Sequence, residues 1–143
     1  MYIEDAVAAI IYNENNEILL HLRDDKEDIW FPNHWGLFGG AIEKGEKIEE
    51  ALEREVFEEI ELQNFNSEFF SEFQFNFIEI SPKFFKRFYY KIFIEKSRTQ
   101  YLQLHEGQKF SFFSENELKK ILVTPYDSFV LNVYFNIKKI NTR

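Results

Sequence analysis

Acidic side chains fall on the apolar face of a predicted helix, and this placement constrains the fold more than any other feature of the chain. Residues 47–60, KIEEALEREVFEEI, repeat apolar positions with helical spacing. At about 100° per residue, Glu55 and Glu59 lie within about 60° of apolar residues on neighbouring turns, and Glu58 borders the same face. The helix must therefore pack a face that carries carboxylates against the rest of the chain.

Carboxylates on this face need a compensating charge. A buried carboxylate is costly unless it is paired or bound to a metal, and Glu55, Glu58 and Glu59 also repel one another. Arg54 offsets only part of this repulsion. A hard divalent cation prefers oxygen ligands of this kind. The pattern therefore favours a cation site over the alternative, a solvated helix held by ion pairs four residues apart.

Three glycines, Gly39, Gly40 and Gly45, precede the helix. Glycine permits backbone turns that other residues resist, and it lets the chain pass close to a metal ion or a phosphate group. The glycines alone are a weak signal. Joined at fixed spacing to Glu46, Arg54 and the acidic helix face, they form a specific pattern for a site that binds a metal or a phosphate.

The rest of the chain predicts strands on both sides of this helix. Apolar runs bounded by turn residues predict strands over residues 5–13, 17–23, 68–80, 84–95 and 109–114. Residues 24–35 are predicted as a loop, and residues 36–40 as a strand end that turns into a loop. Residues 81–83, SPK, are predicted to end one strand before the next begins.

Two further helices are predicted near the C-terminal end. Ser114 and Glu117 form a capping-box signature, which predicts a short helix over residues 115–122. Pro125 follows a threonine cap and opens a last helix through residue 140. This order predicts one α/β (α+β) domain over residues 1–143, in which helices pack on the faces of a mixed sheet.

Composition excludes several classes of protein. The 143 residues are 45% hydrophobic and include 18 Phe, most of which we expect in the core. The chain has no apolar run long enough for a membrane span, no basic signal-peptide start and no cysteine, which together predict a cytoplasmic protein without membrane contact. A net charge of −8 disfavours a nucleic-acid polymer as partner, and an anionic ligand would need a divalent cation to screen the repulsion.

The segment from Gly40 to Leu62 resembles the Nudix box, the signature of the Nudix hydrolases. Gly40 is followed after five residues by Glu46, and after seven more by REVFEEIEL. Eight of the nine fixed positions agree with the box, and the exception is Glu61, which replaces the final glycine. A left-handed backbone is common at that position, and a glutamate there would cost about 1–2 kcal/mol in an unchanged geometry. The substitution therefore bears on how the helix ends and not on the ligands.

The resemblance implies a Nudix-type mixed sheet between helices and hydrolysis of a nucleoside diphosphate derivative with Mg²⁺ or Mn²⁺. Carried over by position, Glu55, Glu58 and Glu59 would hold the metal, helped by the carbonyl group of Gly39. Such a cation would neutralise diphosphate charge and activate a water molecule. This explains how an acidic protein can act on an anionic small-molecule nucleotide.

The resemblance also implies supporting residues. Glu46 and Arg54 would form a pair that orients the loop and the helix. Relatives differ in the general base, so Glu55 and Glu106 are both candidates, while an exposed loop acid is the plainer interpretation of Glu106.

Substrate contacts are less well defined than the box. Arg23, His34, Phe38 and Arg87 are candidates, with salt bridges as the alternative role of the two arginines. Phe38 stands where many relatives carry a proline before the glycine pair. None of the three histidines has a partner at metal spacing, so a zinc site is not expected.

The resemblance leaves several substrates open. The expected one is a nucleoside triphosphate, unmodified or oxidised, that is cleaved to release pyrophosphate. The alternatives are a nucleotide sugar of the GDP-mannose or ADP-ribose type, and a nucleotide-binding module without catalysis. Every charged position of the box is present, which favours an enzyme. Relatives are often homodimers, which makes a homodimer a further hypothesis.

Overall fold

A mixed sheet forms the centre of the molecule. Within residues 4–79 and 84–141, which the computed structural model describes, the sheet has seven strands. They are β1 (Ala6–Tyr12), β2 (Ile18–Leu22), β3 (Trp35–Gly36), β4 (Phe38–Ala41), β5 (Ser67–Phe75), β6 (Phe85–Phe93) and β7 (Lys109–Phe113). The helices in the same part of the chain are α1 (Ile48–Ile60), α2 (Glu115–Leu118) and α3 (Pro125–Asn141), with a 3-10 turn, η1 (Lys96–Tyr101), that the sequence did not predict.

Strand β1 organises the sheet. It runs parallel to β6 along its whole length and antiparallel to β4 and β2 along the other edge. On that edge β4 pairs with the first half of β1, from Ala6 opposite Ala41 to Ala9 opposite Phe38, and β2 pairs near its end. The glycine-rich strand β4 is therefore fixed beside the start of the central strand.

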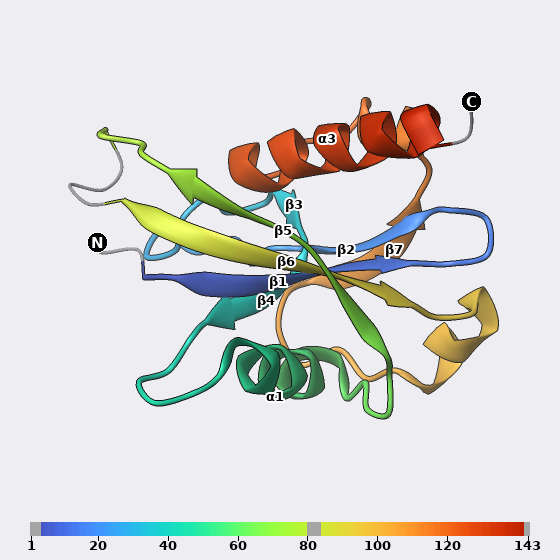
Figure 1. The fold of residues 1–143 in the computed structure, drawn as a ribbon, viewed down its shortest axis with the longest axis horizontal. Helices are drawn as coiled ribbons and strands as arrows, with labels where there is room; N and C mark the ends of the chain where they lie inside the picture. The colour runs from blue at the N-terminus through green and yellow to red at the C-terminus, as the bar shows by residue number, and fades with distance from the viewer. Residues whose placement is uncertain (1–3, 80–83, 142–143) are drawn as a thin grey trace.

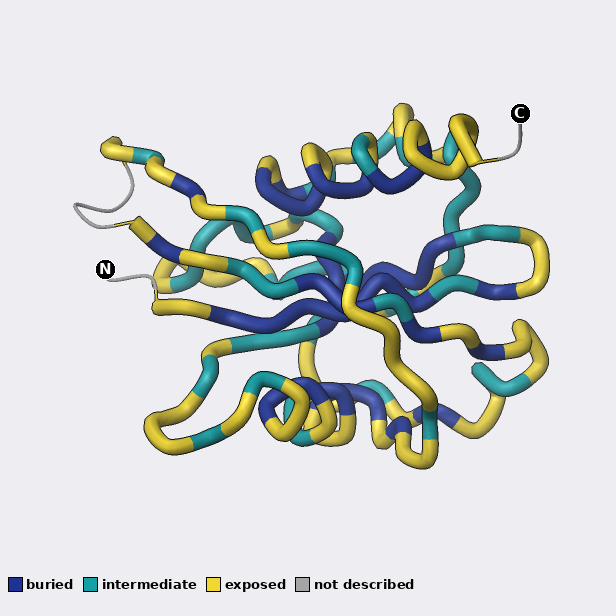
Figure 2. The backbone as a smooth tube through the Cα atoms, in the orientation of Figure 1, coloured by how far each residue is buried: buried dark blue, intermediate teal, exposed yellow. Residues whose placement is uncertain are grey.

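The sheet lies between two helices, with α1 on one face and α3 on the other (Figure 1). Val7, Ala9 and Ile11 pack in a core cluster with α1, while Ala8 and Ile10 pack in a second cluster with α3. Successive side chains of a strand point to opposite faces, so a strand buried on both faces has a continuous apolar run. Figure 2 shows this burial along β1 and on the inner sides of both helices. The predicted fold class is confirmed.

The predicted strand over residues 68–80 is too long. Strand β5 ends at Phe75, which pairs with Phe85, the first residue of β6. Phe77 packs its ring against both of these side chains, with ring centroids 5.6 Å and 6.1 Å apart, and does not continue the ladder. Residue 80 and the predicted break at residues 81–83 lie outside the described residues.

The predicted helix over residues 115–122 is correct only for its first turn. The capping box is confirmed, because the Glu117 N–H donates to Ser114 Oγ (3.2 Å) and the Ser114 N–H donates to the Glu117 carboxylate (2.9 Å). The helix then ends at Leu118, since the following segment pairs with the sheet.

Strand β3 explains this early end. The N–H of Trp35 donates to Leu122 O (2.8 Å), and the N–H of Thr124 donates to Trp35 O (2.8 Å). The segment after α2 therefore bonds to β3, which begins inside the region predicted as a loop. Long-range backbone pairing outweighs the local helical pattern here.

Helix α3 begins at Pro125 as predicted and packs Val130, Leu131 and Tyr134 on the sheet. In the described ranges, the helices are too short or too polar to cross a membrane.

Candidate active site

Helix α1 brings one of its glutamates into the protein interior. Glu59 is only 2% exposed and shares the buried face of the helix with Ala51, Leu52, Val56 and Ile60. Its Oε1 accepts a hydrogen bond from the Gly39 N–H at 2.7 Å. The expectation that Glu59 lies on the apolar face is confirmed, while Glu55 is half-buried and Glu58 is exposed.

The two glycines of β4 make close contacts with other parts of the chain. A Cβ atom at Gly39 would lie 2.0 Å from the carbonyl oxygen of Val7, so this position admits no larger residue without moving the backbone. A Cβ atom at Gly40 would lie 2.5 Å from the carboxylate of Glu55. The glycine pair therefore lets β4 lie directly against β1 and against the acidic face of α1.

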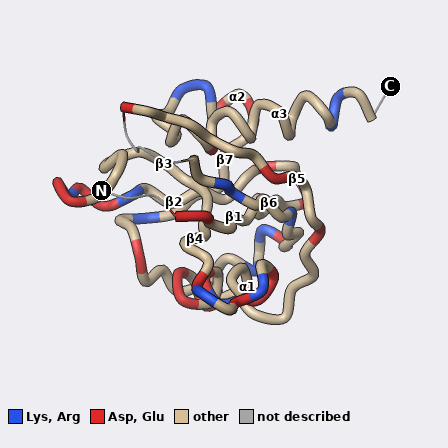
Figure 3. The backbone as a smooth tube through the Cα atoms, turned by 60° about the vertical axis from the view of Figure 1, so that its left-hand side comes forward, with Lys and Arg blue, Asp and Glu red and all other residues tan. Residues whose placement is uncertain are grey.

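Arg54 connects the acidic residues to the loop before the helix. Its guanidinium donates two hydrogen bonds to Glu46 (2.7 Å and 2.9 Å), one to Ala41 O (3.0 Å) and one to Glu55 (2.8 Å). A weaker bond reaches Glu58 at 3.3 Å. The hydrogen bonds from Arg54 lower the pKa of Glu46 to about 2. Acidic and basic positions accordingly crowd along α1 in Figure 3.

Glu55 and Glu59 lack full charge compensation. Burial raises the pKa of Glu59 well above its usual value, and the negative charge of Glu106 raises it further. Burial also raises the pKa of Glu55, although Arg54 partly opposes this effect. Burial thus disfavours the ionised form of both carboxyl groups, and a nearby cation would favour it.

The donor set fits a hard cation, although its side chains do not converge in this structure. Carboxylate oxygens at a half-buried position are the ligands that Mg²⁺ and Mn²⁺ prefer. Within the described ranges, no three acidic or histidine side chains are arranged closely enough to hold a metal ion. Arg54 bonds to Glu55 and Glu58, so a cation would compete with this guanidinium for two of the expected ligands.

His21 lies beside this cluster, a position that the sequence did not predict. Its Nε2 is 4.0 Å from Glu59 Oε2, its ring stacks on Phe38 with centroids 4.6 Å apart, and its Nδ1 has no hydrogen-bond partner among the described residues. Burial lowers the pKa of His21 to about 4, so the ring is neutral at pH 7. A polar residue within the apolar strand ILLHL was the only signal in the sequence.

The loop that carries Glu106 is joined to the end of α1. The N–H of His105 donates to Glu59 O (2.8 Å), and the N–H of Gln103 donates to Ile60 O (3.2 Å). The charge of Glu106 raises the pKa of both Glu55 and Glu59, which places Glu106 near the acidic cluster.

A cavity of about 290 Å³ opens next to the glycine pair. Its lining residues come from the N-terminal segment, the 23–30 loop, β4, β6 and α3: Glu4, Ala6, Arg23, Asp28, Ile29, Trp30, Gly40, Ala41, Phe85, Arg87 and Tyr126. It combines aromatic and apolar surface, which suits a flat ring, with two arginines and two acidic residues, Glu4 and Asp28.

Two of the four expected substrate contacts line this cavity. The Arg87 guanidinium lies 4.5 Å from the ring centre of Tyr126 and is 3.3 Å from Asp127, and Arg23 Nε donates to Trp30 O at 2.9 Å. The other two lie elsewhere. Phe38 is fully buried in the core. His34 bonds to Pro32 O, packs against Phe31 and does not line this cavity.

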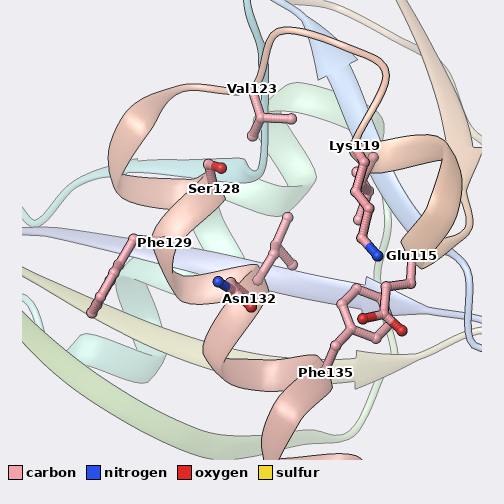
Figure 4. A pocket seen from close by; sticks show the side chains of 9 residues that line it. Glu115, Lys119, Val123, Ser128, Phe129, Asn132 and Phe135 are labelled. Atoms are coloured by element: carbon pink, nitrogen blue, oxygen red, sulfur yellow. The ribbon is translucent and has the colours of Figure 1, made fainter.

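A second cavity, of about 270 Å³, lies between α2 and α3 and shares no lining residue with the acidic cluster. Figure 4 shows its mixed lining, with the Phe129 and Phe135 rings and the Asn132 amide of α3 and with Glu115 and Lys119 of the α2 region. We assign it no part in the chemistry of α1.

Comparison with known proteins agrees with this geometry. Nucleoside triphosphatase NudI of Escherichia coli is 44% identical over 54 residues, which cover 38% of this chain and 37% of that protein. The chain therefore matches little more than a third of this curated relative.

Solved structures share the fold over nearly the whole chain. The E. coli ORF135 protein is 26% identical with a TM-score of 0.71, covering 96% of this chain and 92% of the other. The MutT protein of Methanosarcina mazei Go1 is 20% identical with a TM-score of 0.75, covering 99% and 97%. The NUDIX domain of Shewanella oneidensis NrtR, solved with ADP ribose, is 15% identical with a TM-score of 0.73, covering 92% and 86%.

The family model described as NUDIX domain matches residues 3–133, which includes all the acidic residues described above. The box residues, the sheet between two helices and this match agree, and the chain belongs to the Nudix hydrolase family.

Proposed function

We propose that the protein hydrolyses a nucleoside triphosphate, unmodified or oxidised, with Mg²⁺ or Mn²⁺ and releases pyrophosphate. The observation that carries the proposal is the position of Glu55 and Glu59. The Glu55 carboxylate lies against Gly40, which lines a cavity with two arginines, and Glu59 accepts a hydrogen bond from the neighbouring Gly39 N–H. Burial raises the pKa of both carboxyl groups, so neither charge is fully compensated. A cation at the carboxylates and a nucleotide in the cavity would place a diphosphate between them.

Each residue of the cluster has a role in this proposal. Glu55, Glu58 and Glu59, with the carbonyl oxygen of Gly39, would hold the cation. When bound, a divalent cation neutralises diphosphate charge and lowers the pKa of a water molecule. Arg54 and Glu46 keep the loop and the helix in register through their paired hydrogen bonds.

The proton of the attacking water needs an acceptor. Glu55 and Glu106 are the two candidates. The raised pKa of Glu55 brings this carboxyl closer to the working pH, as a general base requires. Glu106 is favoured by its charge coupling to both Glu55 and Glu59.

The choice of a triphosphate rests on the partial match to a nucleoside triphosphatase and on the two arginines of the cavity. A nucleotide sugar is the second candidate, because a domain of the same fold was solved with ADP ribose. A binding module without catalysis is less favoured, since all charged box positions are present.

The test is a mass-spectrometric assay of separate substrates. Unmodified and oxidised nucleoside triphosphates, ADP-ribose and GDP- and UDP-sugars are each incubated with Mg²⁺, with Mn²⁺ or with a chelator. We expect cation-dependent loss of a triphosphate with release of pyrophosphate. Glu59→Gln should lower turnover at least a hundredfold, whereas Glu53→Gln, on the exposed side of the same helix, serves as the matched control.

Three outcomes would contradict parts of the proposal. If the protein hydrolyses only a nucleotide sugar, the proposed substrate class is wrong and a nucleotide sugar takes its place. Equal turnover in the presence of the chelator would show that the reaction does not need a divalent cation. No turnover of any compound, despite tight nucleotide binding, would favour the binding module.

A further inference from the structure

Glu61, the residue that departs from the Nudix box, has a left-handed backbone, which a glycine adopts readily. Its φ and ψ angles are 55° and 31°, in the left-handed region, and its N–H donates to Phe57 O at 2.8 Å. Glycine adopts this conformation without strain, whereas a glutamate does not. The sequence therefore retains a disfavoured residue at the end of α1, and its side chain is the place to look for the reason.

The Glu61 carboxylate bonds to His105 Nε2. The partners are 44 residues apart in sequence, and they join the end of α1 to the loop over residues 102–107. The same loop bonds through its backbone to Glu59 O and Ile60 O, which are among the last carbonyl groups of the helix. The hydrogen bond between the Glu61 and His105 side chains thus adds a further connection, here called the loop tie, to a loop whose backbone already bonds to the helix end.

Glu106 follows His105 directly in this loop. The loop then turns sharply at Gly107, whose φ is 94°, and the N–H of Gln108 bonds to Leu22 O at 2.8 Å. A Cβ atom at Gly107 would lie 2.8 Å from His21 Nδ1, so the loop is tightly packed on its other side as well. Both ends of the loop are therefore fixed, and Glu106 lies between them, directly after His105.

We propose that Glu61 and His105 are positioning residues that hold Glu106 beside Glu55 and Glu59. This inference rests on the proposed function, because Glu106 matters only if the acidic cluster binds a cation or activates water. It assigns a purpose to the one substituted box position. The strain at Glu61 is offset by a tie that a glycine cannot make.

The decisive variant is Glu61→Gly, because it separates stability from activity. It relieves the left-handed strain, so the thermal midpoint should stay equal or rise. It also releases His105, so kcat should fall about fivefold to twentyfold with a small change in KM. Glu61→Gln keeps an oxygen that can accept from the imidazole and should recover most of the lost turnover.

A double-mutant cycle tests whether the two residues act as a unit. His105→Ala should reduce kcat about as much as Glu61→Gly, and the double variant should be no slower than either one. The effect of Glu61→Gly should also disappear in a Glu106→Gln background. Additive losses, or a fall in kcat that only follows a fall in the thermal midpoint, would overturn the inference.

Amide hydrogen exchange provides a readout that does not depend on turnover. In Glu61→Gly, the amides of Gln103 and His105 should exchange at least tenfold faster, while those in the middle of α1 stay unchanged. This result with an inactive wild-type protein would refute the proposed function and leave the loop tie standing. Unchanged exchange and unchanged kcat in Glu61→Gly would refute the tie itself.

Discussion

Glu59 is held in a position where its own charge is unfavourable. It accepts a hydrogen bond from Gly39, but its nearest basic side chain, His21, is neutral at pH 7. Burial raises the pKa of folded Glu59 above the value of about 4.3 expected in the unfolded chain. Between these two values the folded protein binds more protons than the unfolded chain, so stability falls as the pH rises through this window.

A substitution at this residue should stabilise the protein while removing its function. Without metal at pH 7.5, Glu59→Gln should raise the free energy of unfolding by about 1 kcal/mol, or the midpoint by about 2–4 °C, because no charge is buried. The gain should shrink towards pH 4, where Glu59 is protonated. Calorimetry with chelator and with Mn²⁺ measures both effects. A wild type that is more stable than the variant without metal, or a variant that keeps the Mn²⁺-dependent shift, would contradict this prediction.

Strand β4 contains two glycines that face different kinds of neighbour. Gly39 faces the rigid backbone of Val7, whereas Gly40 faces the movable carboxylate of Glu55. The first contact fixes the pairing of β4 with β1. The second allows Glu55 to lie close to the strand.

Substitution of each glycine by alanine should therefore have a different effect. Gly39→Ala should destabilise the fold by several kcal/mol, on the order of 3 or more, because backbone atoms must separate. Gly40→Ala should unfold within a few degrees of wild type but lose at least tenfold in Mn²⁺ affinity, since Glu55 must turn away. Thermal melts and metal titration distinguish the two, and equal loss of stability in both variants would show that the glycines serve one common steric role.

Asp127 connects three separate parts of the fold. From the first turn of α3, it accepts hydrogen bonds from the Leu37 N–H (3.0 Å), Thr124 Oγ1 (3.0 Å) and Tyr89 Oη (2.9 Å), and it pairs with Arg87. It is only 1% exposed. The helix on one face of the sheet is thereby tied to the residue before β4 and to an arginine of the cavity.

Removing this carboxylate should affect stability and substrate binding together. Asp127→Ala removes the carboxylate that pairs with Arg87 and leaves the donors of Leu37 and Thr124 without this acceptor, so we expect a loss of about 3–5 kcal/mol. Asp127→Asn keeps part of the network and should lose less. Chemical denaturation gives the stability, and nucleotide titration of the Asn variant should show weaker binding. If Asp127→Ala leaves the free energy of unfolding unchanged, this prediction is wrong, and water molecules replace the hydrogen bonds of Asp127 without loss of stability.

Local sequence patterns were enough to predict helix α1 and several strands. The periodicity of residues 47–60 placed Glu59 on the buried face, and the apolar runs located β1, β2 and β6, because these patterns depend on neighbours along the chain. The box spacing likewise identified Glu46 and Arg54, which the structure brings into contact.

The contacts between segments distant in sequence became visible only in the folded structure. The pairing of Trp35 with the segment after α2 ended a helix that local pattern favoured, and no spacing rule placed His21 beside Glu59 or Glu61 beside His105. These partners are 38 and 44 residues apart, so their contact depends on strand register and loop closure. Periodicity describes which face a residue occupies, but the packing of distant segments determines which residue it meets there.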